Sequence, residues 1–263
     1  MRCVGPVRRG TWANGRRIFG ADVTPAQLAA FAGKVTGTYY DFVIDVGRCG
    51  AMSAQDLANQ IESVHGREEY LAMRRDGGGA IILTAHMGSF EVGLASLRAY
   101  EPNIHVVFKR DATSEFEVIR QSLRATLGVH EAPVDAGWNT WVGLRDALAS
   151  DHVVVMQGDR AVPGQKAQSV PMFGAHLSLP LGPIVLAQIS GSPIVPVFVV
   201  RTASGRCRLF VESAIRVDPN AKLIDGVHPQ LLQWAKVLEK YIAAYPEQWL
   251  MLEAAFVEDN PPT

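Results

Sequence analysis

The sequence predicts an α/β protein with a central, mixed and mostly parallel sheet flanked by helices. Apolar runs of strand length alternate along the chain with segments of helical periodicity, which is the pattern of such folds. Two of these apolar runs, Ile81–Thr84 and Val153–Met156, are expected to be the central strands. A chain of 263 residues suits one domain, which we place at residues 21–263 with about six or seven strands. A basic N-terminal arm at residues 1–20, which could be flexible, precedes it.

The individual elements follow from capping, periodicity and chain-breaking residues. A first helix is predicted at Met52–His65, where Ser53 can cap the start and Leu57, Ile61 and Val64 share a face. Further helices are predicted after Glu91 to about Tyr100 and at Ser114–Leu127, Thr140–Ala149, Pro183–Ser190 and Pro229–Tyr245. Further strands are predicted at Ile104–Phe108, His152–Met156, Ile194–Val200 and Arg206–Glu212.

Composition and charge restrict the class of protein. With 48% hydrophobic and 19% charged residues, the chain should fold rather than remain disordered. Its net charge of −1 does not favour nucleic-acid binding. The first 20 residues nevertheless hold five arginines and no acidic residue. Such a segment can rest on anionic lipid, or it can be a solvated terminus.

Cysteine usage and hydropathy indicate a reducing compartment. Cys3, Cys49 and Cys207 match neither a disulfide framework nor a zinc site, so we expect reduced thiols and no metal. We expect no export, because no signal-peptide-like apolar run opens the chain. The stretch Leu177–Val200 carries no charged residue and is long enough to span a bilayer. Its prolines and glycines favour a loop, a short helix and a buried strand instead.

A histidine followed by an acidic residue five positions later occurs twice, and context separates the two pairs. His130 and Asp135 enclose Pro133 in a predicted loop. His86 and Glu91 directly follow a predicted buried strand, at the carboxyl edge of the sheet, where open α/β sheets bind ligands. Five positions on a regular helix rotate the side chains apart. We therefore expect His86 in a turn, Glu91 in the first helical turn, and Gly88 to give the turn its backbone freedom.

This pair fits general-base chemistry on a hydroxyl group. If Glu91 accepts a hydrogen bond from one ring nitrogen of His86, the other nitrogen can take a proton from an attacking hydroxyl. General-base assistance contributes roughly 10²–10⁴ in rate. The tetrahedral oxyanion needs hydrogen-bond donors, which the backbone amides near Gly88 or an arginine could supply. On local evidence alone, a core histidine bonded to a helix end explains His86 equally well.

Four blocks of the sequence resemble the bacterial lipid A biosynthesis acyltransferases of the lauroyl/myristoyl type and their mannoside-acylating relatives, within the glycerolipid acyltransferase superfamily. The likeness covers roughly Ile81 to Leu252. The blocks are HMGSFE at His86–Glu91, the helix end Ser122–Gly128, the region Val153–Val197 with Asp159-Arg160, Phe173-Gly174, Gly182-Pro183 and Pro193–Pro196, and finally Tyr245–Leu250. The order of features in the third block is the most specific part of the resemblance.

The resemblance implies roles for individual residues. By it, His86 is the catalytic base and Glu91 its partner. Arg124 would bind a phosphate or support the oxyanion, although it could instead lie on an exposed helix face with Arg120, one turn away. Asp159 would orient His86 or the acceptor hydroxyl.

Two further positions and the acyl tunnel complete the expected site. Arg160 is either a salt-bridge partner of Asp159 or a substrate contact, and Gly88 would lie against the substrate. An apolar tunnel should hold the acyl chain. Four apolar residues near the Gly-Pro turn could line this tunnel, although we favour a place in the core for them. They are Leu177, Leu179, Leu181 and Ile184.

The resemblance also implies substrates and location. We expect transfer of a fatty acyl group from an acyl carrier protein or coenzyme A thioester to a hydroxyl of a lipid or glycolipid, without a cofactor. The family's N-terminal membrane helix has no counterpart, so we expect peripheral contact with the cytoplasmic face of the inner membrane. The last residues lack the family's basic and aromatic character, which disfavours lipid A itself as acceptor. The alternatives are an ester or thioester hydrolase with the same residues, a non-catalytic lipid-binding relative, and an acyltransferase for a carrier-bound natural product.

Overall fold

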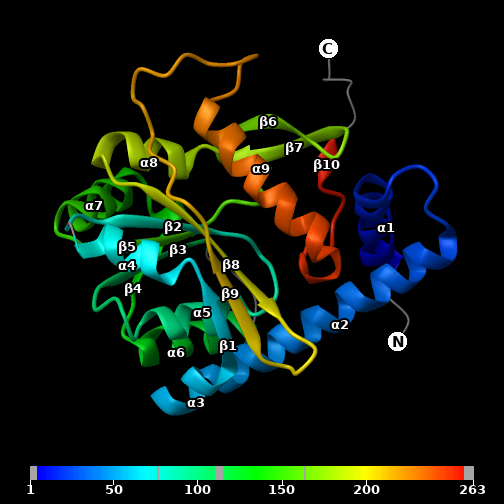
Figure 1. The fold of residues 1–263 in the computed structure, drawn as a ribbon, viewed down its shortest axis with the longest axis horizontal. Coiled ribbons are helices and arrows are strands. Elements are labelled where there is room, and N and C mark those ends of the chain that lie inside the picture. Colours follow the sequence, from blue (N-terminus) through cyan, green and yellow to red (C-terminus); the bar gives the residue numbers. More distant parts are fainter. Residues whose placement is uncertain (1–4, 76, 110–114, 163, 258–263) are drawn as a thin grey trace.

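The protein is built on a mixed, mostly parallel sheet of seven strands, which confirms the predicted fold class (Figure 1). The computed structural model describes residues 5–75, 77–109, 115–162 and 164–257. Within these residues the strand order is β1-β9-β8-β2-β5-β3-β4, with β8 and β9 antiparallel and the other neighbouring pairs parallel. The strands are β1 (Ile61–His65), β2 (Ala80–Thr84), β3 (Ile104–Phe108), β4 (His130–Pro133), β5 (Val153–Gln157), β8 (Ile194–Arg201) and β9 (Cys207–Val211).

The two strands predicted to be central are neighbours in the middle of the sheet. β2 pairs with β5 in parallel from Ala80 opposite Val153 to Thr84 opposite Gln157. All five residues of β2 are buried, because helices cover the sheet on both faces. The register of this pair fixes which residues meet beyond the ends of the two strands.

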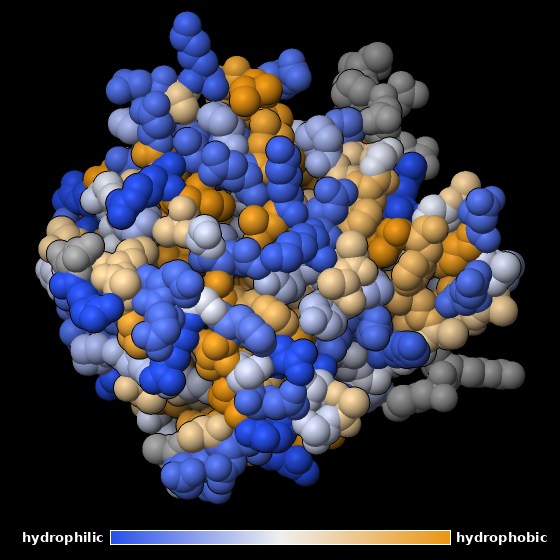
Figure 2. Space-filling view, in the orientation of Figure 1, coloured by the Kyte–Doolittle hydropathy of each residue, from blue (hydrophilic) through white to orange (hydrophobic). Residues whose placement is uncertain are grey.

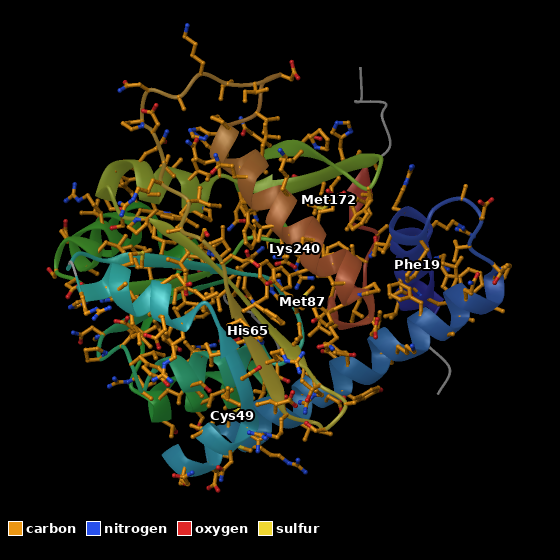
Figure 3. The ribbon with its side chains drawn as sticks, in the orientation of Figure 1. Phe19, Cys49, His65, Met87, Met172 and Lys240 are labelled. Carbon is orange, nitrogen blue, oxygen red and sulfur yellow. The ribbon has the colours of Figure 1, made fainter. Side chains whose placement is uncertain are left out.

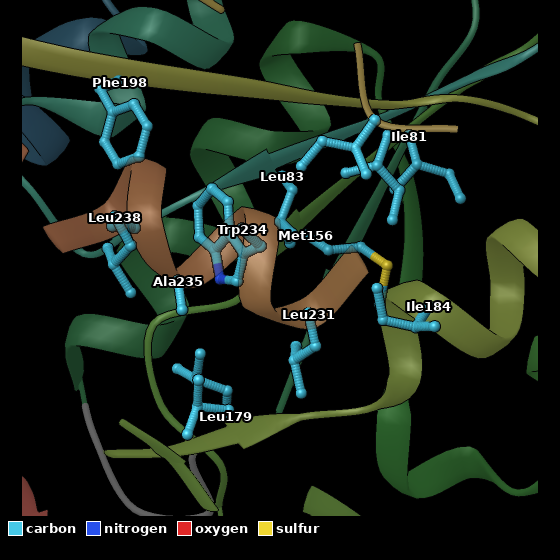
Figure 4. Close-up of a cluster of buried hydrophobic side chains, with 14 of the residues drawn as sticks. Ile81, Leu83, Met156, Leu179, Ile184, Phe198, Leu231, Trp234, Ala235 and Leu238 are labelled. Atoms are coloured by element: carbon cyan, nitrogen blue, oxygen red, sulfur yellow. The ribbon is translucent and has the colours of Figure 1, made fainter. Parts of the chain in front are cut away.

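Helices form a layer on each face of the sheet (Figure 1). One layer is α7 (Trp138–Ala149), α8 (Gly182–Ser190) and α9 (Pro229–Ala244), and the other is α3 (Ala54–Gln60), α4 (Arg67–Arg75), α5 (Phe90–Leu97) and α6 (Glu115–Leu127). Figure 4 shows the core of the first layer, in which Trp234 and Leu231 of α9 pack towards Leu83 and Met156 of the sheet. This face is densely filled, whereas the opposite face leaves a cavity described below.

The long uncharged stretch Leu177–Val200 folds as a strand, a short helix and a strand. It contains most of β7 (Ala175–Pro180), then α8, then most of β8. β7 lies between β6 (Ala167–Met172) and β10 (Phe256–Val257) in a small antiparallel sheet. Among the helices in the described part of the chain, none combines the length and apolar character needed to cross a bilayer.

The N-terminal region is more ordered than the arm that the sequence suggested. Helix α1 (Gly5–Phe19) packs against α2 (Pro25–Cys49), which begins at a capping box of Thr24 and Gln27. The amide of Asn14 donates to the carbonyl oxygens of Met251 at 3.2 Å and Glu253 at 2.8 Å. These contacts join α1 to the C-terminal segment, so residues 5–19 pack on the domain in this structure.

Three further details differ from the prediction. The helix expected at Met52–His65 ends at Gln60, and its second half is strand β1, because Val64 and its neighbours gain a parallel partner in β9. The expected cap Ser114 lies outside the described residues, and α6 is described from Glu115. The expected loop at His130–Asp135 contains strand β4, which pairs with β3.

Candidate active site

The register of β2 and β5 brings His86 and Asp159 together. Each lies two residues beyond the paired strand ends, Thr84 and Gln157. The amide of Gly158 donates to the carbonyl of Thr84 at 2.9 Å, which extends the alignment past the sheet. Because parallel strands end at the same edge, the side chains that follow them are neighbours at the carboxyl edge of the sheet.

His86 and Asp159 form a hydrogen-bonded imidazole–carboxylate pair. Nδ1 of His86 lies 2.7 Å from Oδ1 of Asp159, whose side chain is fully buried, whereas the histidine side chain is 23% exposed. The indole of Trp249 donates to the second carboxylate oxygen at 3.0 Å. Burial alone raises the pKa of Asp159, but His86, Arg160 and Trp249 together hold that pKa below its ordinary value. Asp159 is therefore ionised, and Nδ1 of His86 must carry a proton in order to donate to it.

Glu91, the partner expected for His86 from the spacing, is bonded elsewhere, and the hydrogen bond to His86 comes from Asp159, which the resemblance implied would orient His86 or the acceptor hydroxyl. Among the hydrogen bonds of the described residues, Glu91 accepts from Nε of Arg120 at 3.1 Å, and its side chain is 5% exposed. Glu91 lies in the first turn of α5 as predicted, but that turn directs its carboxylate towards α6. The side chain that orients His86 comes from the neighbouring strand instead.

The turn that carries His86 needs glycine at position 88. Gly88 has φ = +53°, and a Cβ there would lie 2.4 Å from the carbonyl oxygen of Val199. The amide of Gly88 donates to the carbonyl of Gln248 at 2.9 Å, and the amide of Met87 donates to Ala85 at 2.8 Å. These two amides are therefore used within the protein, contrary to the expectation that the amides near Gly88 are available to an oxyanion.

A buried polar cluster joins the same turn to α2. Ser89 and the guanidinium of Arg201 both donate to Oδ2 of Asp45, and Arg201 also donates to the hydroxyl of Ser89 at 2.9 Å. Ser89 is the N-cap residue of α5, yet its side chain makes no capping hydrogen bond to the helix. The first-turn amides of α5 are therefore not capped by the side chain of Ser89.

A cavity of about 670 Å³ lies next to this turn, between the sheet and the helices α3 to α6. This volume falls within the roughly 300–1,000 Å³ of typical small-molecule sites. The walls are mainly apolar, for example Ile82, Val155, Val197, Val199, Leu209 and Val211. Phe90, Glu91 and Arg120 line the cavity beside the turn, and the rings of His86 and Phe90 meet edge to face with centroids 5.8 Å apart. His86 is not itself among the residues that line the cavity, and its ring is joined to the cavity wall through Phe90.

Arg124 and Arg160, which were expected to contact the substrate, contact other residues of the protein. Arg124 is buried and forms ion pairs with Glu117 at 2.5 Å and Glu131 at 2.6 Å, while its guanidinium lies 4.2 Å from the ring centroid of Phe108, a cavity-lining residue. It is therefore not on an exposed helix face. Arg160 contacts the sulfur of Met251 at 3.6 Å and lowers the pKa of Asp159 by its charge. None of these contacts brings Arg124 to His86.

The residues near the Gly-Pro turn are core, as favoured from the sequence. Leu177, Leu179 and Ile184 are buried in the cluster on the α7–α9 face of the sheet, and Leu181 packs against it. None of the four lines the cavity, which lies on the opposite face.

The sequence analysis did not identify two residues of this site. Arg120 was seen only as a helical neighbour of Arg124, and Trp249 only as part of a C-terminal block. The pairing of His86 with Asp159 could have been found from the sequence. Each residue lies two positions after the end of a strand, and both strands were predicted to be central. Across the described part of the chain, no group of three histidine, cysteine, aspartate or glutamate side chains could hold a metal ion.

Fold and site together define an α/β protein with a histidine–carboxylate pair at the carboxyl edge of its sheet and an apolar cavity nearby, and sequence comparison gives the family. The profile described as "Bacterial lipid A biosynthesis acyltransferase" matches residues 10–257. The chain belongs to this acyltransferase family. It is also similar to a protein named phosphatidylinositol mannoside acyltransferase from Mycobacterium tuberculosis (strain CDC 1551 / Oshkosh), with 23% identity over 95% of this chain and 83% of that protein.

Proposed function

We propose that this acyltransferase moves a fatty acyl group from an acyl carrier protein or coenzyme A thioester to a hydroxyl of a lipid or glycolipid, with His86 as general base. The observation that carries the proposal is the position of His86. One ring nitrogen is held 2.7 Å from buried Asp159, and the ring packs against Phe90, which lines an apolar cavity of about 670 Å³. A base beside a chamber for a hydrocarbon tail suits acyl transfer.

The proposed reaction uses the two nitrogens of His86 differently. Nδ1–H donates to Asp159, which leaves Nε2 as an acceptor. Nε2 removes the proton of the acceptor hydroxyl while the oxygen attacks the thioester carbonyl. The tetrahedral intermediate then expels the thiolate, which takes the proton back from His86. Asp159 stabilises the imidazolium that exists between these two steps.

The oxyanion of the intermediate would meet the start of α5. The amides of Met87 and Gly88 are used elsewhere, but the N-cap side chain of Ser89 leaves the first turn of this helix uncapped. First-turn amides and the positive end of the helix dipole both favour negative charge. We assign the oxyanion to these amides, beside His86.

The remaining site residues receive roles consistent with their contacts. Glu91 holds Arg120 at the cavity end nearest His86, where the guanidinium can face the thioester or an acceptor phosphate. Arg124 supports this wall from behind through Phe108 rather than contacting substrate. Arg160 steadies the charge of Asp159, and Gly88 permits the turn.

The acceptor and the location follow from the family and the surface. The relative's name refers to a mannosylated lipid, so we propose a glycolipid or lipid hydroxyl as acceptor. Such acceptors lie in the inner membrane, and we propose peripheral contact at its cytoplasmic face through α1 and α2. Arg8, Arg9 and Arg16 are exposed there beside Phe19, which is 45% exposed, and Figure 2 shows hydrophobic and hydrophilic side chains side by side over these helices.

The test is acyl transfer by the purified protein with labelled acyl-carrier-protein and coenzyme A thioesters and a bacterial lipid extract, with products identified by mass spectrometry. His86→Ala should abolish formation of acylated lipid with little change in thermal stability. His130→Ala, in the second histidine–acid pair, is the matched control and should keep full activity. Label found only as free acid would identify a hydrolase, and His86→Ala activity within about tenfold of wild type would contradict the role of His86.

A further inference from the structure

The C-terminal segment Gln248–Leu250 holds the turn that carries His86. The amide of Leu250 donates to the carbonyl of His86 at 2.7 Å, and the amide of Gly88 donates to the carbonyl of Gln248 at 2.9 Å. Met87 and Trp249 thus form an isolated antiparallel bridge. Met87, labelled in Figure 3, is 1% exposed, so this bridge lies in the interior. The backbone position of His86 therefore depends on residues more than 160 positions away in the sequence.

The same segment is itself fixed to the sheet. The side-chain amide of Gln248 accepts from the amide of Arg201 at 2.7 Å and donates to the carbonyl of Arg201 at 2.8 Å. Arg201 is the last residue of β8 and also takes part in the cluster with Ser89 and Asp45. Two hydrogen bonds from one side chain to one residue leave Gln248 little freedom.

The side chain of Trp249 reaches the other half of the pair. Its indole is 2% exposed and donates to Oδ2 of Asp159 at 3.0 Å, while Oδ1 of the same carboxylate faces His86. A buried carboxylate with one oxygen unpaired could rotate or admit water, and either change would loosen its hold on the imidazole. Trp249 does not line the cavity, so it has no direct contact with the acyl chain there.

We propose that Trp249 is a positioning residue for acyl transfer, because it lies between the two residues whose backbone bonds hold the turn of His86, and its indole N–H locks the carboxylate of Asp159. The proposal rests on the proposed function of His86. One residue thereby fixes the relative placement of both members of the pair. Loss of the indole N–H of Trp249 should therefore lower kcat and leave the binding of the acyl donor unchanged.

The test compares Trp249→Phe with Trp234→Phe. Both tryptophans are fully buried in the same core, and Trp234 also donates its indole N–H, to the carbonyl of Gly158 at 2.9 Å. Trp249→Phe should lower kcat about tenfold to a hundredfold, the value of a hydrogen bond to a charged group, with the KM for the acyl donor unchanged. Trp234→Phe should lose comparable thermal stability without a comparable loss of kcat.

A substrate-free readout separates this proposal from the proposed function. In protein with nitrogen-15-labelled histidine, the Nδ1 proton of His86, assigned by its loss in Asp159→Asn, should give a protected NMR signal. That signal should broaden or vanish in Trp249→Phe and persist in Trp234→Phe. A wild-type protein without transferase activity would refute the proposed function and leave this signal to decide the positioning role. An unchanged His86 signal in Trp249→Phe, or equal losses of kcat in Trp249→Phe and Trp234→Phe, would overturn the positioning role of Trp249.

A second variant applies if Trp249→Phe does not fold. Replacement of Trp249 by β-(3-benzothienyl)alanine keeps the shape of the indole and removes only the N–H. The expected outcomes are the same loss of kcat and of the His86 signal. Wild-type kcat and signal in that protein would refute the role of the hydrogen bond.

Discussion

Asp159→Asn tests the pairing of His86 more directly than loss of the histidine itself. Asp159 accepts two hydrogen bonds, from Nδ1 of His86 at 2.7 Å and from Nε1 of Trp249 at 3.0 Å. Asparagine offers one acceptor oxygen and one donor group in the same space. The indole can only donate, so the asparagine oxygen must face Trp249 and its NH₂ must face His86. Nδ1 must then become the acceptor, which moves the ring proton to Nε2 and removes the base.

The expected loss follows from this change of tautomer. In a serine-protease triad the same substitution lowers kcat by about 10⁴, and we expect about 10³–10⁴ here, or about 4–5.5 kcal/mol in the activation free energy. The assay is steady-state transfer with the best donor, beside thermal unfolding. Glu91→Gln is the matched comparison. Since glutamine can still accept from Arg120, its kcat should fall less than about tenfold.

The double variant Asp159→Asn, Trp249→Phe sharpens the prediction. Without the indole donor, the asparagine is free to rotate and present its oxygen to Nδ1–H of His86. The double variant should therefore be more active than Asp159→Asn alone, although Trp249→Phe by itself reduces activity. The reasoning is refuted if Asp159→Asn stays within about tenfold of wild type while Glu91→Gln loses about 10³. It is refuted equally if the second substitution lowers activity further.

Three further predictions concern stability and chain length. Burial and the neighbouring His130 and His152 lower the pKa of His105 from 6.5 to about 4, so its neutral form favours the fold above pH 6.5 and this contribution is lost as the pH falls towards 4. Urea unfolding at about pH 7.5 and about pH 5 should show this loss, which His105→Phe should reduce. Arg74→Ala should cost about 2–3 kcal/mol, because the buried carboxylate of Glu101 loses its cation, whereas Arg145→Ala in an exposed pair should change stability by less than about 0.5 kcal/mol. Val197→Phe narrows the cavity and should shift donor preference towards shorter acyl chains in a competition assay read by mass spectrometry, and an unchanged preference would place the chain elsewhere.

The parts of the fold that sequence predicted are those with one dominant local pattern. The runs that became β2 and β5 are apolar and short, and α9 carries a clear apolar stripe, so burial and periodicity agree there. Residues Ile61–His65 were assigned to a helix because Ile61 and Val64 also fit a helical face. These residues form a strand because they pair with β9, which is distant in the sequence, for example Val64 with Leu209.

The site was predicted in part for the same reason. His86 and the glycine at position 88 follow from a local turn, which the sequence displays. Spacing within HMGSFE favoured Glu91 as the partner of His86, and the pairing with Asp159 was open only through the resemblance, because it depends on the register between two strands. The contacts of Trp249 and of Arg120 join segments far apart in the chain, and no local pattern reports such contacts. Helix α2 was overlooked although Thr24, Pro25 and Gln27 are a start signal.

The burial of Asp159 has a catalytic consequence in the proposed mechanism. In that mechanism the fully buried carboxylate faces a neutral imidazole before the reaction, and among the described residues the N–H groups of His86 and Trp249 and the charge of Arg160 offset part of its lost hydration. When His86 accepts the proton of the acceptor hydroxyl, the pair becomes an imidazolium and a carboxylate whose charges cancel. The electrostatic attraction is therefore greater at the tetrahedral stage than in the substrate complex, and only such a difference lowers the barrier. Glu91 cannot provide it, because its carboxylate is already paired with the permanent charge of Arg120.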